Sequence, residues 1–149
     1  MESLVCAGLV LTAVPAAGQE ANGTARTVLD GVFSTAQASR GRATFSSVCA
    51  ECHTSGQFRG ASFQASWAGR SVASFFELLR TTMPNDDPGR LTRDEYAAVI
   101  AYLLQLNGYP AGERSLPGDA AVLERIRFEA RADSATDAPA RPPSGPGHE

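Results

Sequence analysis

The stretch that decides the fold is residues 34–53, STAQASRGRATFSSVCAECH, and its last five residues, CAECH at 49–53, are its most informative part. Ser34 followed by Gln37 is the pattern of a capping box, which predicts a helix beginning there. Small and apolar residues then recur at spacings of three and four, which places them on one helix face: Ala38, Gly41, Phe45, Val48, Cys49 and Cys52. The two thiols are therefore expected to point the same way, with His53 directly after them.

A C-x-x-C-H run is the attachment signature of c-type haem. Two thiols at this spacing can add to the two vinyl groups on one porphyrin edge, and His53 can then give its imidazole to the iron. Two other interpretations use the same residues. A redox-active dithiol is expected in a βαβ context, whereas this motif ends a predicted helix in a helical chain. A zinc site needs a fourth ligand, and Cys6 and His148 lie in the predicted leader and tail. One covalent haem c held by Cys49, Cys52 and His53 is favoured.

The second iron ligand is predicted to be Met83. The chain has 2 methionines, and the other one is Met1. Met83 opens the segment MPNDDPG at 83–89, where two prolines exclude a regular helix. A thioether is a soft ligand for haem iron, and His/Met ligation raises the reduction potential. The alternative is that Met83 fills a gap in the core, but a polar, rigid loop favours ligation.

Three stretches together resemble a bacterial monohaem class I cytochrome c: AQASRGRATF before CAECH, TTMP at 81–84, and EYAAVIAYLLQLNGYPAG at 95–112. The resemblance covers about residues 35–112. It implies an all-α, class I cytochrome c fold with three main helices around one covalently bound haem, and a one-electron carrier rather than an enzyme. It also implies that the first and last helices cross at a small residue packed against an aromatic. The matching residues are Gly41 and Tyr102, with Phe45 beside them.

The resemblance leaves parts of the haem environment open. Family members often carry a Gly-Pro after the haem motif, whose carbonyl orients the proximal histidine. The corresponding residues here are RGAS at 59–62, so the hydrogen-bond partner of His53 Nδ1 is undetermined. Trp67 is predicted to bind the haem through a propionate, and Arg59 and Arg70 are weaker candidates for the same role. The alternatives are a packing anchor for Trp67 and solvated surface positions for the arginines.

The rest of the chain is predicted to add helices and no strand. Residues 54–70 lack a sustained period and predict a loop with aromatic anchors at Phe58, Phe63 and Trp67. A second helix is expected over 71–81, and a third from a capping box at Thr92 and Glu95 to the stop signal at 107–108. The domain boundaries follow: signal peptide 1–18, loose lead-in 19–33, cytochrome c domain 34–112, an appended helical segment 113–132 with a helix over about 119–130, and a disordered Pro-rich tail 133–149.

Composition and the first residues bear on partners and location. All 13 basic residues are arginines against 16 acidic ones, a net charge of −3, which argues against nucleic-acid binding. No apolar run reaches the roughly 18–20 residues of a membrane span. Residues 4–17 are apolar apart from Thr12 and precede Gly18, as in a signal peptide, although no Lys or Arg precedes them. The alternative is a buried N-terminal helix. A periplasmic location follows, because thioether formation uses haem delivered outside the cytoplasm.

The predicted function is electron transfer to transient redox protein partners, by a monomer. Two alternatives remain: a cytochrome subunit dedicated to a quinoprotein-like dehydrogenase, and a haem enzyme with an open iron site if Met83 is not a ligand. A thiol oxidoreductase, using the two cysteines, is a third alternative.

Overall fold

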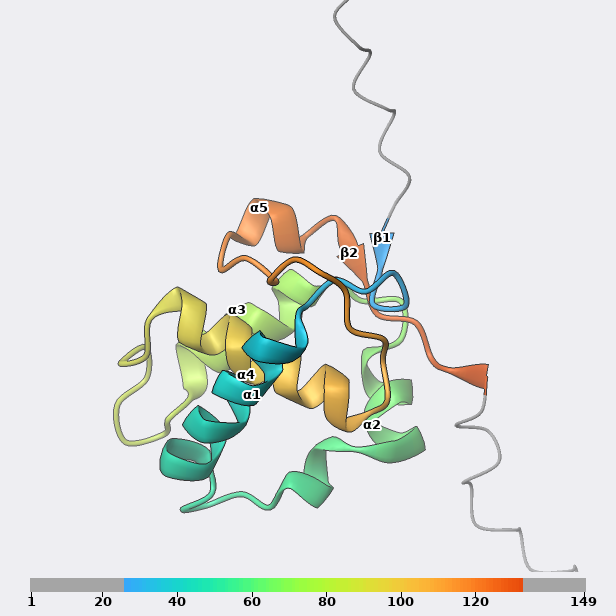
Figure 1. Ribbon diagram of the computed structural model, residues 1–149. Helices are drawn as coiled ribbons and strands as arrows, with labels where there is room; N and C mark the ends of the chain where they lie inside the picture. The colour runs from blue at the N-terminus through green and yellow to red at the C-terminus, as the bar shows by residue number, and fades with distance from the viewer. Residues whose placement is uncertain (1–25, 133–149) are drawn as a thin grey trace, which may run out of the picture.

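The computed structural model describes residues 26–132, which are mostly helical (Figure 1). The elements are β1 (Arg26–Thr27), α1 (Thr35–Thr44), α2 (Gly60–Trp67), α3 (Val72–Thr82), α4 (Arg93–Leu106), α5 (Ala120–Leu123) and β2 (Ile126–Arg127). A π-helical turn, η1 (Phe45–Cys49), prolongs α1, and a 3-10 turn, η2 (Ser55–Phe58), precedes α2. The predicted signal peptide and the tail lie outside the described residues. Within 26–132, no helix is long and apolar enough to cross a membrane.

The main helices begin at the side chains that their sequences predict. Ser34 caps α1 by accepting from the Gln37 N–H at 3.2 Å, and Ser71 caps α3 in the same way. Thr92 and Glu95 form a complete capping box at the start of α4. These contacts satisfy N–H groups that have no partner inside a helix. The starts of the three main helices are therefore confirmed.

Half of the capping box predicted at Ser34 is wrong. The Gln37 side chain does not return to Ser34 but is buried, with an exposed fraction of 3%. Its amide donates to the Leu116 carbonyl at 2.7 Å and accepts from the Leu116 N–H at 2.8 Å. Gln37 thus ties the segment after α4 to the start of α1.

Gly41 is the point where α1 and α4 approach each other, as the sequence predicts. A Cβ at this position would overlap the Ala98 carbonyl group of α4. One turn further along, the Phe45 ring packs on Tyr102 with ring centroids 5.5 Å apart. A glycine inside a helix costs about 1 kcal/mol relative to alanine. The close backbone approach explains why it is used here.

The structure corrects the prediction of a loop over 54–70, because residues 55–58 and 60–67 are helical. The local signals for α2 are weak: Arg59 at its N-cap makes no side-chain capping bond, and Gly60 begins the helix with φ +83°. Two of the three aromatic anchors are confirmed as buried, Phe63 and Trp67. Phe58 is partly buried against the core.

The segments flanking the predicted domain also differ from expectation. Residues 26–33 are not loose, since Val28, Val32 and Phe33 are buried; residues 19–25 lie outside the described part. The helix expected over 119–130 is reduced to α5, because Ile126 and Arg127 pair as a parallel strand with Arg26 and Thr27. The segment 113–132 shares the main core through four buried side chains, Leu116, Leu123, Ile126 and Phe128.

Candidate haem site

Cys49 is the last residue of η1, and Cys52 and His53 lie on the turn that follows it. The N–H groups of Cys52 and His53 both donate to the Cys49 carbonyl, at 3.2 and 2.9 Å. Both cysteines are free; Cys49 is half-buried against the core and Cys52 is exposed. Burial raises the pKa of the Cys49 thiol, and the positive charge of Arg90 offsets part of that rise. The donor set suits covalent attachment of one porphyrin edge.

His53 is oriented by Gln57, which fills the role that the sequence left open. Nδ1 lies 3.2 Å from the Gln57 Oε1, and the Thr54 N–H donates to the same oxygen at 3.2 Å. An amide oxygen only accepts, so Nδ1 carries the proton. Nε2 has no hydrogen-bond partner among residues 26–132 and is the atom suited to bind iron. The Thr54/Gln57 capping box is a local signal that could have identified Gln57.

The proximal side of the site is backed by an aromatic chain. The His53 ring meets Phe58 edge-on at 5.3 Å, and Phe58 meets Phe45 at 5.9 Å. Asn107 fixes the backbone behind this chain: its side chain donates to the Phe58 carbonyl at 2.7 Å and accepts from the Gly60 N–H at 2.9 Å. The sequence marked Asn107 only as a helix stop, because its partners lie far away along the chain.

Met83 lies at the end of α3, at the same end of the molecule as the turn after α1 (Figure 1). The Met83 N–H donates to the Leu79 carbonyl at 2.9 Å, and its carbonyl accepts from the Tyr96 hydroxyl at 2.6 Å. The Met83 side chain is half-buried, and its thioether is the candidate for a second iron ligand.

Trp67 lies in an aromatic cluster between α2, α3 and β2. Its ring centroid is 4.4 Å from that of Phe75 and 5.9 Å from that of Phe128, and the Arg70 guanidinium covers its face at 4.4 Å. Arg59 is exposed. These contacts are those of a packing anchor; hydrogen bonding of Trp67, Arg59 or Arg70 to haem propionates stays a prediction.

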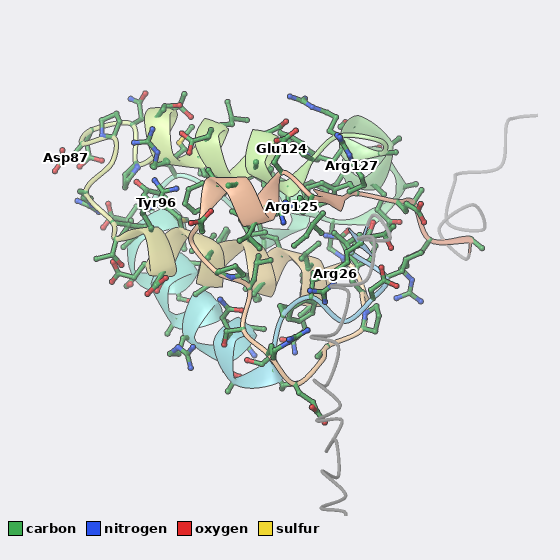
Figure 2. The ribbon with its side chains drawn as sticks, turned by 90° about the horizontal axis from the view of Figure 1, so that it is seen from above. Arg26, Asp87, Tyr96, Glu124, Arg125 and Arg127 are labelled. Atoms are coloured by element: carbon green, nitrogen blue, oxygen red, sulfur yellow. The ribbon has the colours of Figure 1, made fainter. Side chains whose placement is uncertain are left out.

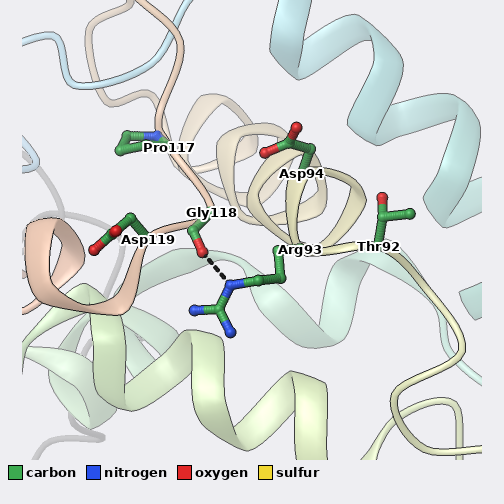
Figure 3. Close-up of a pocket in the computed structure, with 6 residues that line it drawn as sticks. All are labelled: Thr92, Arg93, Asp94, Pro117, Gly118 and Asp119. Atoms are coloured by element: carbon green, nitrogen blue, oxygen red, sulfur yellow. Dashed lines mark hydrogen bonds between the residues drawn. The ribbon is translucent and has the colours of Figure 1, made fainter.

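A shallow groove lies at the start of α4, lined by Thr92, Arg93, Asp94, Pro117, Gly118 and Asp119 (Figure 3). Arg93 crosses it, donating from Nε to the Gly118 carbonyl at 2.6 Å, with its guanidinium 5.0 Å from the Phe76 ring centre. This hydrogen bond of Arg93 holds the chain after α4 against the start of that helix. None of the predicted site residues lines it.

Residues 36–103 match the family model described as "Cytochrome C oxidase, cbb3-type, subunit III". Residues 36–103 form a cytochrome c domain of this family. The match includes the CAECH motif and Met83, and the helix packing is that of a class I cytochrome c, as the sequence predicted. No curated protein and no solved structure matches the chain. A cytochrome c domain of this family implies covalent haem c and electron transfer.

Proposed function

We propose that this cytochrome is a periplasmic one-electron carrier and not an enzyme, with one covalent haem c ligated by His53 and Met83. The observation that carries the proposal is the placement of Met83. It is the only thioether in residues 26–132, and its backbone is held between α3 and α4 at the end of the molecule that carries CAECH. When bound, the haem supplies an iron that cycles between ferrous and ferric states.

Each residue of the site has a distinct role. Cys49 and Cys52 would hold the porphyrin covalently when haem is bound. His53 binds through Nε2, and Gln57 keeps its ring in place through Nδ1. Met83 would supply its thioether as the second iron ligand, which would leave no open site on the iron for peroxide, oxygen or small anions. Phe45 and Phe58 pack on each other, and Phe58 also meets the His53 ring, so these two rings would keep water away from the imidazole.

Electron exchange then takes place at the exposed end of the site, where Cys52 lies at the surface. The partner interface is small and short-lived, below about 1,200 Å² as in other weak redox encounters. Arginine charges steer it, so turnover with a partner falls as salt is added.

Visible spectroscopy of the protein produced with a cytochrome c maturation system tests the ligand set. Haem should stay on the chain after denaturation and solvent extraction and give a c-type pyridine haemochrome. The ferric protein should be low-spin and bind cyanide slowly.

Met83→Ala should lower the potential and open the iron to added ligands, while Met83→His should remain low-spin. A wild-type protein that is already high-spin and binds anions quickly would replace the carrier with an open-site haem enzyme.

The periplasmic location is supported by the apolar residues 4–17 and by the need for haem attachment outside the cytoplasm. The intact mass of the mature protein tests it. Cleavage near Gly18 is expected, and retention of residues 1–18 in the native host would contradict it.

A second candidate is a dedicated subunit of an oxidoreductase complex. It is favoured by the family description, which names a subunit of an oxidase. Co-purification from the native host separates the two: a stable stoichiometric complex supports the subunit, and a free monomer supports the carrier.

A further inference from the structure

We infer that Tyr96, in the first turn of α4, is a positioning residue for Met83. It holds together the two ends of the loop formed by residues 84–88. The inference rests on the proposed function, since it takes Met83 as the second ligand. Tyr96 and Asp87, which belongs to the loop after Met83, lie at the same end of the molecule (Figure 2). Its exposed fraction is 2%, and it lies far from CAECH in the sequence.

One hydroxyl joins both ends of this loop. The Tyr96 O–H donates to the Met83 carbonyl at 2.6 Å, and its oxygen accepts from the Gly89 N–H at 3.1 Å. Residues 84–88 therefore form a loop whose first and last neighbours are tied to the same atom. Gly89 has φ +86°, a conformation that side-chain-bearing residues rarely adopt, so the closing geometry favours glycine.

The Tyr96 ring is itself fixed in place. It packs against Phe76 of α3 with ring centroids 6.3 Å apart, and α4 is fixed to α1 at the Gly41 crossing. The backbone of Met83 is thus connected through Tyr96 and α4 to α1, and η1, which continues α1, ends at Cys49. A hydrogen bond at the ligand's own carbonyl limits how far the loop can swing away from the iron.

The remaining contacts of the loop are weaker and local. The Asp87 N–H donates to the Pro84 carbonyl at 3.1 Å, and Arg90 reaches Asp86 at 3.6 Å at an exposed position. An exposed ion pair contributes little to stability. Tyr96 is the buried polar group among these contacts, and its removal leaves a carbonyl and an N–H without their partner.

The test compares Tyr96→Phe with Tyr109→Phe in the haem-loaded protein. Tyr109 is a matched control, because its exposed fraction is 3% and its hydroxyl donates to the Glu129 carbonyl at 2.6 Å, away from Met83. Tyr96→Phe keeps the ring and removes the hydroxyl. It should raise the rate of cyanide binding to the ferric protein about tenfold, weaken the sulfur-to-iron charge-transfer band, and lower the midpoint potential. Tyr109→Phe should lower thermal stability and leave all three unchanged.

Equal cyanide rates in wild type and Tyr96→Phe would overturn the inference, as would equal rises in both variants. Amide hydrogen exchange of wild type gives a second measurement that needs no variant. The Gly89 amide should be protected, and exchange at the rate of an open loop would also overturn the inference. Absence of the sulfur-to-iron band in wild type would instead overturn Met83 ligation, and this outcome is separate from the Gly89 result.

Discussion

Replacing Gly41 by alanine tests the helix crossing on which both sides of the haem site depend. The new Cβ would overlap the Ala98 carbonyl, and its neighbour, the Val99 nitrogen, would lie at 2.9 Å. Because these atoms belong to the backbone, no rotamer change relieves the overlap. To regain ordinary contact distance, α1 and α4 must separate by on the order of 1.5 Å.

The cost can be set against the gain in helix propensity. Overpacking in a core costs about 1–3 kcal/mol, and the upper end applies where the opposing atoms cannot move. Alanine returns about 1 kcal/mol because it is the better helix former. The expected net loss is about 2 kcal/mol, or a fall of about 10 °C in the midpoint of unfolding for a domain near 100 residues.

Thermal and urea unfolding of the haem-loaded protein, followed by circular dichroism, measure this loss. Gly56→Ala is the matched control, since its Cβ would meet only Thr54 Oγ1 at 3.9 Å and its φ is not positive. It should leave stability unchanged within about 0.5 kcal/mol. A Gly41→Ala protein as stable as wild type would refute the close approach of the two helices.

Three further variants test other parts of the site. Gln57→Leu removes the acceptor of the His53 Nδ1–H, so the imidazole becomes a weaker base and the midpoint potential should rise. Gln105→Leu, at an exposed position of α4, is the control. Equal potentials in wild type and Gln57→Leu would contradict the orienting role of Gln57. Trp67→Phe should cost about 1–2 kcal/mol of stability by opening space beside Phe75 and Phe128. A hydrogen bond from the indole N–H to a propionate predicts that the same variant also lowers the midpoint potential. An unchanged potential leaves Trp67 as a packing residue alone. Hydrogen bonds from the Thr92 N–H and hydroxyl lower the pKa of Glu95 below its ordinary value of 4.5, so its contribution to stability is present above that pH and is lost as the pH falls through the lower folded value. Glu95→Ala should therefore be less stable than wild type at neutral pH, and the difference should shrink in acid; a constant difference in pH-dependent unfolding would refute this.

The parts of the fold that sequence predicted well depend on neighbours along the chain. The caps at Ser34, Ser71 and Thr92 join residues three apart, and CAECH completes its geometry within one turn. Gly41 was also predictable, because a glycine inside a helix carries a cost that only a close neighbour explains.

The parts that sequence missed depend on distant partners. Gln37 looks like half of a local capping box, but Leu116 offers it both a donor and an acceptor inside the core. Asn107 looks like a helix stop until the Phe58 carbonyl and the Gly60 N–H are placed beside it. The strands have two residues each and pair across most of the described chain, which is too short a signal to appear as alternation.

The pairing of β1 with β2 has a mechanical consequence. The strands run parallel, so a pull applied before Arg26 and after Arg127 draws them along each other, and their hydrogen bonds resist together rather than one at a time. The Val28 N–H also donates to the Arg127 carbonyl at 2.9 Å, and the Val28 side chain is fully buried. This bond and the strand pair together form a clamp. The clamp lies at the opposite end of the molecule from the turn after α1 (Figure 1). A tension on the two ends of the domain is therefore borne first at this clamp, far from the loop that holds Met83.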